Sequence, residues 1–192
     1  DATVNFVKPL PVRSLYALQQ LPGVIHAEGL RAVAVRILHG PETETTAMIG
    51  IGPNNQLKSV LDVKLKQIHL PENGLVISQT LARKLKLKPQ DNIRIEVLEG
   101  SRPSGVFPIS AVVDDFLGRF VYTRDEFLHR LLKEGPKVNS VLLKTDNEQS
   151  QKLYTQLKGF PAIGSVSFKT AALKTFQDTN AKLLLVFATI LT

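Results

Sequence analysis

GLVISQTLARKL, residues 74–85, predicts a short buried strand that is followed directly by a helix. The apolar run 75–77 has the length of a short strand. The preceding PENG, residues 71–74, is a turn signal, because glycine adopts positive φ without steric cost. Ser78 is a residue type that caps helices, and it stands where this helix is expected to begin. The apolar face of the helix carries Leu81, Ala82 and Leu85.

The residues after this stretch continue as a mostly β unit. Residues 93–97 alternate between apolar and polar side chains, which is typical of a half-buried strand. The loop 100–105 is followed by a further expected strand over 106–113. Residues 56–118 are therefore expected to form one β-rich lobe that contains a single helix.

The chain on either side of this lobe has the pattern of an α/β fold. Its expected strands are 4–7, 24–38, 45–51, 120–122, 138–143 and 163–168, and its expected helices lie over 11–21, after 123, after 146 and from near 170. The 24–38 strand is the clearest, because it alternates over its second half. The fold class is therefore α+β, with an α/β lobe at 1–55 and 119–170 that is split by the β-rich lobe.

Two pairs of polar residues have the spacing of helix caps. Thr123 and Glu126 fit a capping box, in which the hydroxyl and the carboxylate each satisfy an unpaired backbone N–H. Asp146 and Gln149 repeat this arrangement. Each pair is expected to start a helix of the α/β lobe.

The composition is that of a folded protein. The 192 residues are 43% hydrophobic and 21% charged, which excludes wholesale disorder, collagen and a coiled coil. The length accommodates one large domain or two small ones. The absence of cysteine excludes disulfide bonds and thiolate zinc sites.

No sequence motif indicates a metal or nucleotide site. No histidine lies within four residues of another, whereas a metal-binding pair on a helix needs i, i+4 spacing. The four are His26, His39, His69 and His129. A glycine-rich loop followed by Lys-Ser or Lys-Thr is also missing, so the chain itself is not expected to bind ATP.

Ser78 and the pair Asp114-Asp115 are the candidates for hydrolase chemistry. Ser78 lacks the Gly-x-Ser-x-Gly motif of a nucleophile elbow, which favours its role as a helix cap. Adjacent carboxylates on a strand point to opposite sides, so Asp114 and Asp115 are expected to end the strand rather than to share a site. The chain is therefore expected not to be an enzyme.

Positive charge is concentrated in the β-rich lobe. Between residues 57 and 88 lie seven basic and two acidic residues, which account for five of the seven net positive charges of the chain. The candidate contact residues are Lys64, Lys66, Arg83, Lys84, Lys86 and Lys88, with Lys58 beside them. The segment lacks the aromatic residues that stack on nucleic-acid bases. A solvated helix face, contact with anionic lipid headgroups and contact with an acidic partner remain open.

Residues 183–191 are apolar on every side of a helix. A helix that spans a bilayer needs about 20 such residues, and this run is less than half as long. Two interpretations are open: a buried C-terminal helix, or a transmembrane helix that is cut just after it enters the membrane. The residues concerned include Leu183, Leu184, Leu185, Val186 and Phe187.

Several short motifs occur in an order that is similar to one protein family. LPGV at 21–24 precedes the long strand, and IGI at 49–51 ends the next one. The 74–85 stretch with DNI at 91–93 is similar to the family's insert, although Gln90 stands where glycine is usual. Further landmarks lie at 114–122, 138–140 and 159–161. Over nearly its whole length the chain thus resembles the extracytoplasmic domain of MacB/FtsX/LolC-type ABC transporter permeases.

This resemblance implies a domain on the extracytoplasmic, or periplasmic, side of the cell inner membrane. It implies a porter-like α/β lobe into which a small sabre-like β-rich lobe is inserted. Residues 171–192 would then be a stalk helix that leads into a truncated transmembrane helix. The resemblance implies no catalytic residue, cofactor or metal in this domain.

The function implied by the resemblance is mechanical. A separate cytoplasmic ATPase subunit hydrolyses ATP, and the permease couples this to movement or handover of a lipid, lipoprotein, peptide or drug outside the membrane. A periplasmic adaptor or carrier protein is a further expected partner, nucleic acid is not, and the isolated domain is expected to be monomeric. The alternative is a soluble, non-enzymatic binding or scaffold domain with a C-terminal docking helix.

Overall fold

The computed structural model describes residues 1–58, 60, 67–114, 118–146 and 148–168 of the chain. All nine strands expected from the sequence are present among them. In chain order the elements are β1 (Ala2–Pro11), α1 (Ser14–Gln19), β2 (Val24–His39), β3 (Glu42–Ile51), β4 (Leu75–Ser78), α2 (Gln79–Leu85), β5 (Asn92–Val97), β6 (Ser104–Val113), β7 (Phe120–Arg124), α3 (Asp125–Leu132), β8 (Lys137–Thr145), α4 (Ser150–Lys158) and β9 (Ile163–Phe168).

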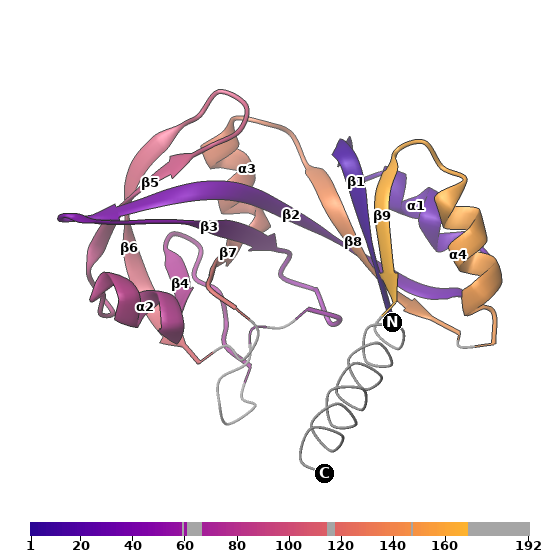
Figure 1. Cartoon of the computed structure of the whole chain (residues 1–192), viewed down its shortest axis with the longest axis horizontal. Helices are drawn as coiled ribbons and strands as arrows, with labels where there is room; N and C mark the ends of the chain where they lie inside the picture. The colour runs from indigo at the N-terminus through magenta and orange to yellow at the C-terminus, as the bar shows by residue number, and fades with distance from the viewer. Residues whose placement is uncertain (59, 61–66, 115–117, 147, 169–192) are drawn as a thin grey trace, which may run out of the picture.

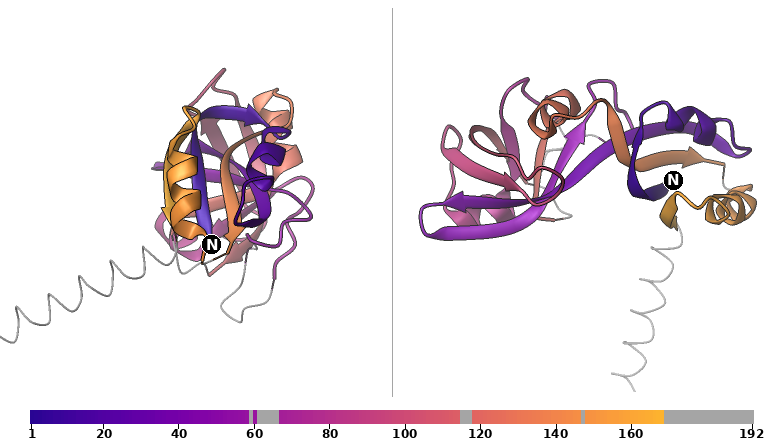
Figure 2. Two further views of the ribbon diagram at one scale, coloured as in Figure 1. Left: turned by 90° about the vertical axis from the view of Figure 1, so that its right-hand side faces the viewer. Right: turned by 90° about the horizontal axis from the view of Figure 1, so that it is seen from above.

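The strands form one sheet that closes on itself at one end. Its order is β3-β7-β4-β6-β5-β2-β8-β1-β9, and β3 also pairs with β2. Strands β2 to β7 therefore form a closed ring, which we call the ring lobe together with α2 and α3. The remaining strands β8, β1 and β9 extend the sheet from β2, and with α1 and α4 they form the smaller lobe. The two lobes lie side by side in Figures 1 and 2.

Each lobe has its own apolar core. In the ring lobe, one face of the strands is covered by α2 and α3, and residues such as Val35, Ile77 and Leu128 are fully buried there. In the smaller lobe, Val4 and Val141 of the sheet pack against α1 and α4. The alternating pattern of β2 places its apolar residues on one face of the ring, as a period of two requires.

The packing divides the chain at residues that differ from the expected lobe boundaries. Strands β3 and β7 and helix α3 were expected in the split α/β lobe, but Met48, Val121 and Leu128 share one core with Leu75 and Ile95. The ring lobe thus begins within β2 and ends before β8. The cause is the length of β2, which spans both lobes, while its alternating sequence does not specify the neighbours of each half.

The expected helix caps are wrong in their hydrogen bonds. Ser78 precedes α2, but its hydroxyl oxygen accepts from the backbone N–H of Phe120 at 3.2 Å and makes no capping bond. Thr123 donates to the carbonyl of Gly74 at 3.2 Å, and α3 begins only after Arg124. Both hydroxyl-bearing residues are fully buried, so tertiary partners replace the local N–H groups.

Two further expectations are changed in extent. Asp146 accepts from the backbone N–H of Glu148 at 3.1 Å and closes a turn ahead of α4, whose N-terminal cap position is Gln149. The helix expected over 11–21 is limited to α1, because Pro11 still pairs with β8.

Within the described part of the chain, none of the helices has both the length and the apolar character to cross a membrane.

Candidate functional site at the junction of the two lobes

The two lobes are connected through β2 and β8. Residues Val24–Leu30 of β2 pair with β8 in the smaller lobe, and from Arg31 to His39 the same strand pairs with β3 in the ring lobe. The change of partner falls between Leu30 and Arg31. The second connection is the segment that leads from α3 into β8. Side chains around Arg31 therefore decide how firmly the lobes are joined.

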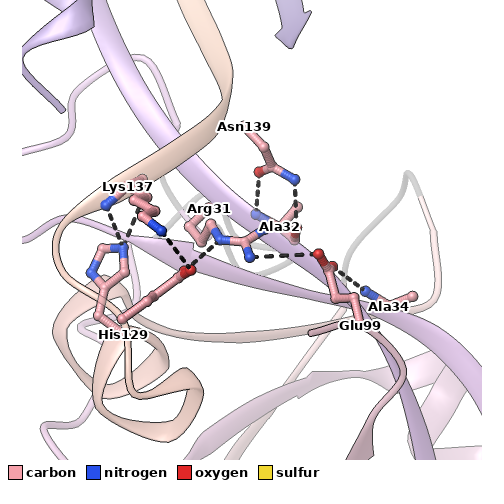
Figure 3. Close-up of polar contacts among 8 residues, drawn as sticks. Arg31, Ala32, Ala34, Glu99, His129, Lys137 and Asn139 are labelled. Carbon is pink, nitrogen blue, oxygen red and sulfur yellow. Dashed lines mark hydrogen bonds and ion pairs between the residues drawn. The ribbon is translucent and has the colours of Figure 1, made fainter. Parts of the chain in front are cut away.

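Asn139 of β8 extends the pairing with β2 beyond the last backbone pair, Leu30 with Ser140. Its side-chain oxygen accepts from the N–H of Ala32 at 2.8 Å, and its amide nitrogen donates to the carbonyl of Ala32 at 2.7 Å (Figure 3). The side-chain amide thus offers the same donor and acceptor as a backbone peptide. It satisfies the backbone of β2 at the point where β8 turns away.

Arg31 is a buried cation at the same point. The residue is 4% exposed, and its Nε donates to Glu134 Oε1 at 2.7 Å. Its Nη1 donates to the carbonyl of Ala32 at 3.0 Å, and its Nη2 lies 3.5 Å from Glu99 Oε2. A buried guanidinium is tolerated only when it is paired, and removal of its partners is strongly destabilising. Arg31 therefore binds three chain segments together.

The two carboxylates come from different loops. Glu134 lies between α3 and β8, and Glu99 lies between β5 and β6. Glu99 also accepts from the N–H of Ala34 through its other oxygen at 3.3 Å. Glu134 is further approached by Lys137 at 4.0 Å. The β5–β6 loop and the α3–β8 connection are thereby held to β2 on the same side (Figure 3).

His129 supports the α3–β8 connection. Its Nε2 lies 2.9 Å from the carbonyl oxygen and 3.2 Å from the backbone nitrogen of Lys137. One tautomer donates to the carbonyl and the other accepts from the N–H, so either form ties α3 to the start of β8. The contact is structural and has no metal-ligating neighbour: the described residues contain no group of three or more side chains that could hold a metal ion.

Apolar packing holds the lobes together beside this polar network. A Cβ atom on Gly29 would lie 2.5 Å from Val138 Cγ1 and 3.0 Å from Leu15 Cδ1, so glycine allows β2 to approach β8 and α1 closely. Leu30 of β2 belongs to a cluster that Leu142 of β8 contacts. The ring-lobe members of that cluster are Ile51, Val60, Val76, Val113 and Tyr122.

A second buried charge ties the loop after β3 to β2. Glu28 is 6% exposed, and its two carboxylate oxygens accept from the N–H groups of Gln56 and Leu57 at 2.7 and 2.8 Å. His26 Nε2 lies 3.0 Å from the same carboxylate. Glu28 belongs to the smaller-lobe half of β2, whereas the loop leaves the ring lobe. This bond therefore also crosses the junction.

The contacts at the junction join chain segments of the two lobes. Its charged side chains are engaged with each other or with the backbone. Glu28 and Arg31 have opposite charges and each is compensated locally, so the junction buries little uncompensated charge. We therefore expect these contacts to restrict the orientation of the ring lobe relative to the smaller lobe.

Comparison with known proteins identifies the fold. No family model and no curated protein matches the sequence. The periplasmic region of MacB from Actinobacillus actinomycetemcomitans matches with a TM-score of 0.56 and 13% identity, over 92% of each chain. The extracellular domain of the noncanonic ABC-type transporter YknZ from Gram-positive bacteria matches with a TM-score of 0.57 and 13% identity, over 86% of this chain and 100% of that one. This chain has the fold of these transporter domains.

The MacB-like fold brings together only part of the basic cluster expected from the sequence. Lys84 Nζ lies 2.6 Å from Glu44 of β3, which Arg119 also contacts at 3.1 Å. Lys86 lies 3.5 Å from Glu42, while Arg83 and Lys88 are exposed near the end of α2. Lys64 and Lys66 lie outside the described residues, as does the expected stalk at 171–192 with Leu183, Leu184, Leu185, Val186 and Phe187.

The candidates for hydrolase chemistry are not assembled into a site. Ser78 is fully buried, and its hydroxyl oxygen is engaged by the N–H of Phe120. Asp114 is partly buried at the end of β6, and Asp115 lies outside the described residues. The buried position of Ser78 removes the exposed nucleophile that an acyl-transfer site requires.

The residues of the junction were not predicted from the sequence. Arg31 has the same parity along β2 as the buried Val33, Val35 and Ile37, and a charged residue at a buried position is a signal for a paired partner. The partners Glu99 and Glu134 are 68 and 103 residues away. The sequence pattern therefore marks Arg31 but does not point to its carboxylates.

Proposed function

We propose that this chain is the extracytoplasmic domain of an ABC transporter permease subunit, located on the periplasmic side of the cell inner membrane. The observation that carries the proposal is the fold shared with the MacB and YknZ domains over most of each chain. A second observation supports it. Ala2 pairs with Phe168, so both ends of the described chain leave the smaller lobe together. Membrane segments that flank this domain would meet it at one point.

In this proposal a cytoplasmic ATPase subunit drives the membrane segments. Their displacement reaches the smaller lobe first, and the junction around Arg31 carries it into the ring lobe. A closely packed junction that is held by the Arg31 ion pairs and the Asn139 amide would transmit a rotation from one lobe to the other, because tightly packed protein interiors transmit strain. The ring lobe would then move or hand over a lipid, lipoprotein, peptide or drug, alone or with a periplasmic adaptor or carrier protein. The isolated domain is a monomer and not an enzyme.

The test uses the product of the gene that encodes this chain. Cell membranes are washed at alkaline pH, and the size and location of the product are determined with an antibody against the domain. The proposal expects a product much longer than 192 residues that stays in the membrane and copurifies with a cytoplasmic ATPase. A product of this length that washes off would contradict it and would favour a soluble binding or scaffold domain.

A further inference from the structure

A basic groove lies at the end of α2. It has a volume of about 490 Å³ and is lined by Arg83, Lys86 and Lys88 together with apolar residues that include Leu87 and Val112. The lining contains no acidic residue. We call it the α2 groove. Of the six basic residues singled out in the sequence, these are the three that the described structure places in one concave surface.

The cations of the α2 groove are available for an external anion. Lys84, next to them in sequence, is engaged by Glu44, but Lys86 is 79% exposed and its contact with Glu42 is long at 3.5 Å. Such exposed pairs are worth little. Within the described residues, Arg83 and Lys88 make no side-chain ion pair. Arg83 and Lys88 therefore stand at an open surface without an ion-pair partner among the described residues, and Lys86 has only its long, exposed contact with Glu42.

Helix stability explains only part of this pattern. Arg83 stands in the last turn of α2, where a cation interacts favourably with the helix dipole. Lys86 and Lys88 follow the helix, and Lys86 has the left-handed backbone that ends it. Lys88 uses its backbone N–H, not its ammonium group, to bind Asp91 at 2.7 Å. The ammonium group of Lys88 thus makes no ion pair among the described residues, and that of Lys86 makes only the exposed contact with Glu42.

The position of the groove favours a membrane over an acidic protein. Helix α2 lies at the lower edge of the ring lobe in Figure 1, at the same end as the N-terminus of the smaller lobe. Because Ala2 pairs with Phe168, both described chain ends lie at that level. The β5–β6 loop and the α3–β8 connection lie at the opposite, upper end. The cations of the α2 groove are therefore on the side from which flanking membrane segments would depart.

We propose that the α2 groove contacts the phosphate groups of an anionic phospholipid surface and so sets the resting position of the ring lobe against the membrane. Arginine and lysine bind phosphate through charge-assisted hydrogen bonds, and juxtamembrane cations are attracted to anionic leaflets. This inference rests on the proposed placement beside a membrane. A transport movement that lifts the ring lobe would have to break these contacts.

The test measures how the 192-residue chain partitions onto phosphatidylglycerol vesicles and onto phosphatidylcholine vesicles at low salt. The ratio of the two partition coefficients cancels the contribution of the apolar run at 183–191. The groove variant carries Arg83→Gln, Lys86→Gln and Lys88→Gln. The matched control carries Lys8→Gln, Arg102→Gln and Lys133→Gln, which remove the same charge from the end of β1, the β5–β6 loop and the α3–β8 connection. Lys133 ends α3 with the same left-handed backbone as Lys86.

The proposal expects the chain to prefer phosphatidylglycerol and the groove variant to lower the ratio roughly tenfold or more, since each cation at an anionic surface contributes roughly fivefold. The control variant should change the ratio much less. Equal losses in both variants would show binding by net charge alone and overturn the proposal. Absence of a preference would overturn it too, and would leave an acidic protein as the partner of the groove.

These outcomes are separable from failure of the proposed function. The vesicle measurement needs neither the ATPase nor any membrane segment of a longer product. A product that washes off membranes, combined with a groove-dependent vesicle preference, would reject the permease while retaining the lipid contact. A membrane-retained product without vesicle preference would do the reverse.

Discussion

The junction and the α2 groove use positive charge in opposite ways. Arg31 is 4% exposed and is bound by Glu134, Glu99 and a backbone carbonyl. Lys86 is 79% exposed and has one long contact. Because Arg31 is buried, its charge must be paired within the protein, and it therefore contributes to the fold rather than to binding. The groove cations are exposed and at most weakly paired, so their charge is available to a partner. Mutations should therefore affect stability at the junction and binding at the groove.

The same contrast exists within β2. Arg36 is five residues beyond Arg31 on the opposite face, and its contact with Glu96 is 3.4 Å long and exposed. Both residues are arginines paired with glutamate on one strand. Only Arg31 lies where the sheet changes partners. Comparing substitutions of Arg31 and Arg36 therefore separates the stability contributed by the junction from the stability contributed by an ordinary ion pair on β2.

The largest effect is expected for Arg31→Ala. This change removes the buried cation from Glu134, whose side chain is 16% exposed, and from Glu99, which is 38% exposed. Because Glu99 is partly solvated and Glu134 keeps a 4.0 Å contact with Lys137, the free energy of unfolding should fall by about 3 kcal/mol, the lower end of the range for a broken buried pair. Urea denaturation measures the change. The control Arg36→Ala should cost less than about 1 kcal/mol. Similar losses of unfolding free energy in the two variants would mean that the ion pairs at the junction stabilise the protein no more than an exposed ion pair does.

Asn139→Leu is expected to come second. It leaves the N–H of Ala32 without its partner and the carbonyl of Ala32 with Arg31 alone. The cost should be about 2 kcal/mol, and hydrogen exchange at the Ala32 amide should accelerate. The control Asn5→Leu removes an exposed bond to Ser165 on neighbouring strands and should cost far less. Unchanged exchange at Ala32 would show that the side-chain amide does not extend the sheet.

Gly29→Ala tests the apolar side of the junction. The added methyl group would meet the stiff, buried side chain of Val138, so the strands must separate slightly at a cost of about 1–2 kcal/mol. Gly135→Ala is the control, because a Cβ there meets nothing within 4 Å. Thermal unfolding of both variants gives the comparison. Equal melting temperatures would mean that β2 and β8 adjust freely.

The smallest effect on stability is expected for the groove variant with Arg83→Gln, Lys86→Gln and Lys88→Gln. The interaction of Arg83 with the α2 dipole and the exposed contact of Lys86 with Glu42 are lost, at a total cost below about 1 kcal/mol. Thermal unfolding should therefore be nearly unchanged while vesicle binding falls. A loss of stability comparable to that of Arg31→Ala would assign these cations to the fold and remove the contrast between the two regions.

Local sequence patterns predicted the strands of this fold but not their neighbours. Alternation identified β2 and β5, and the GLVIS run identified β4, because a period of two reports burial directly. It did not report that β2 serves both lobes, which placed the expected boundaries at residues 55 and 119 instead of near Arg31 and β8. Ser78 and Thr123 show the same limit: their local pattern indicated caps, but distant partners took their hydroxyl groups.

The junction itself required the three-dimensional structure. Arg31 could have been noticed in the sequence, because it is a charged residue on the face of β2 that otherwise carries buried apolar residues. Its carboxylates come from two connections and Asn139 from β8, and only the folded chain brings these residues to the same point of β2. For the α2 groove the reverse holds, because its basic residues are adjacent in sequence. The structure was needed there only to show that Lys84 is already paired.

The most direct test of a stiff junction is the distribution of distances between the lobes. The chain contains no cysteine, so Lys152→Cys on α4 and Arg94→Cys on β5 provide unique sites for two spin labels. Pulsed electron paramagnetic resonance should give one narrow distance distribution for the unaltered chain, and Arg36→Ala should leave it unchanged. Arg31→Ala and the milder Glu134→Ala should broaden it. Circular dichroism confirms that each variant is folded. A broad distribution in the unaltered chain, or no broadening in either junction variant, would contradict a junction that fixes the two lobes.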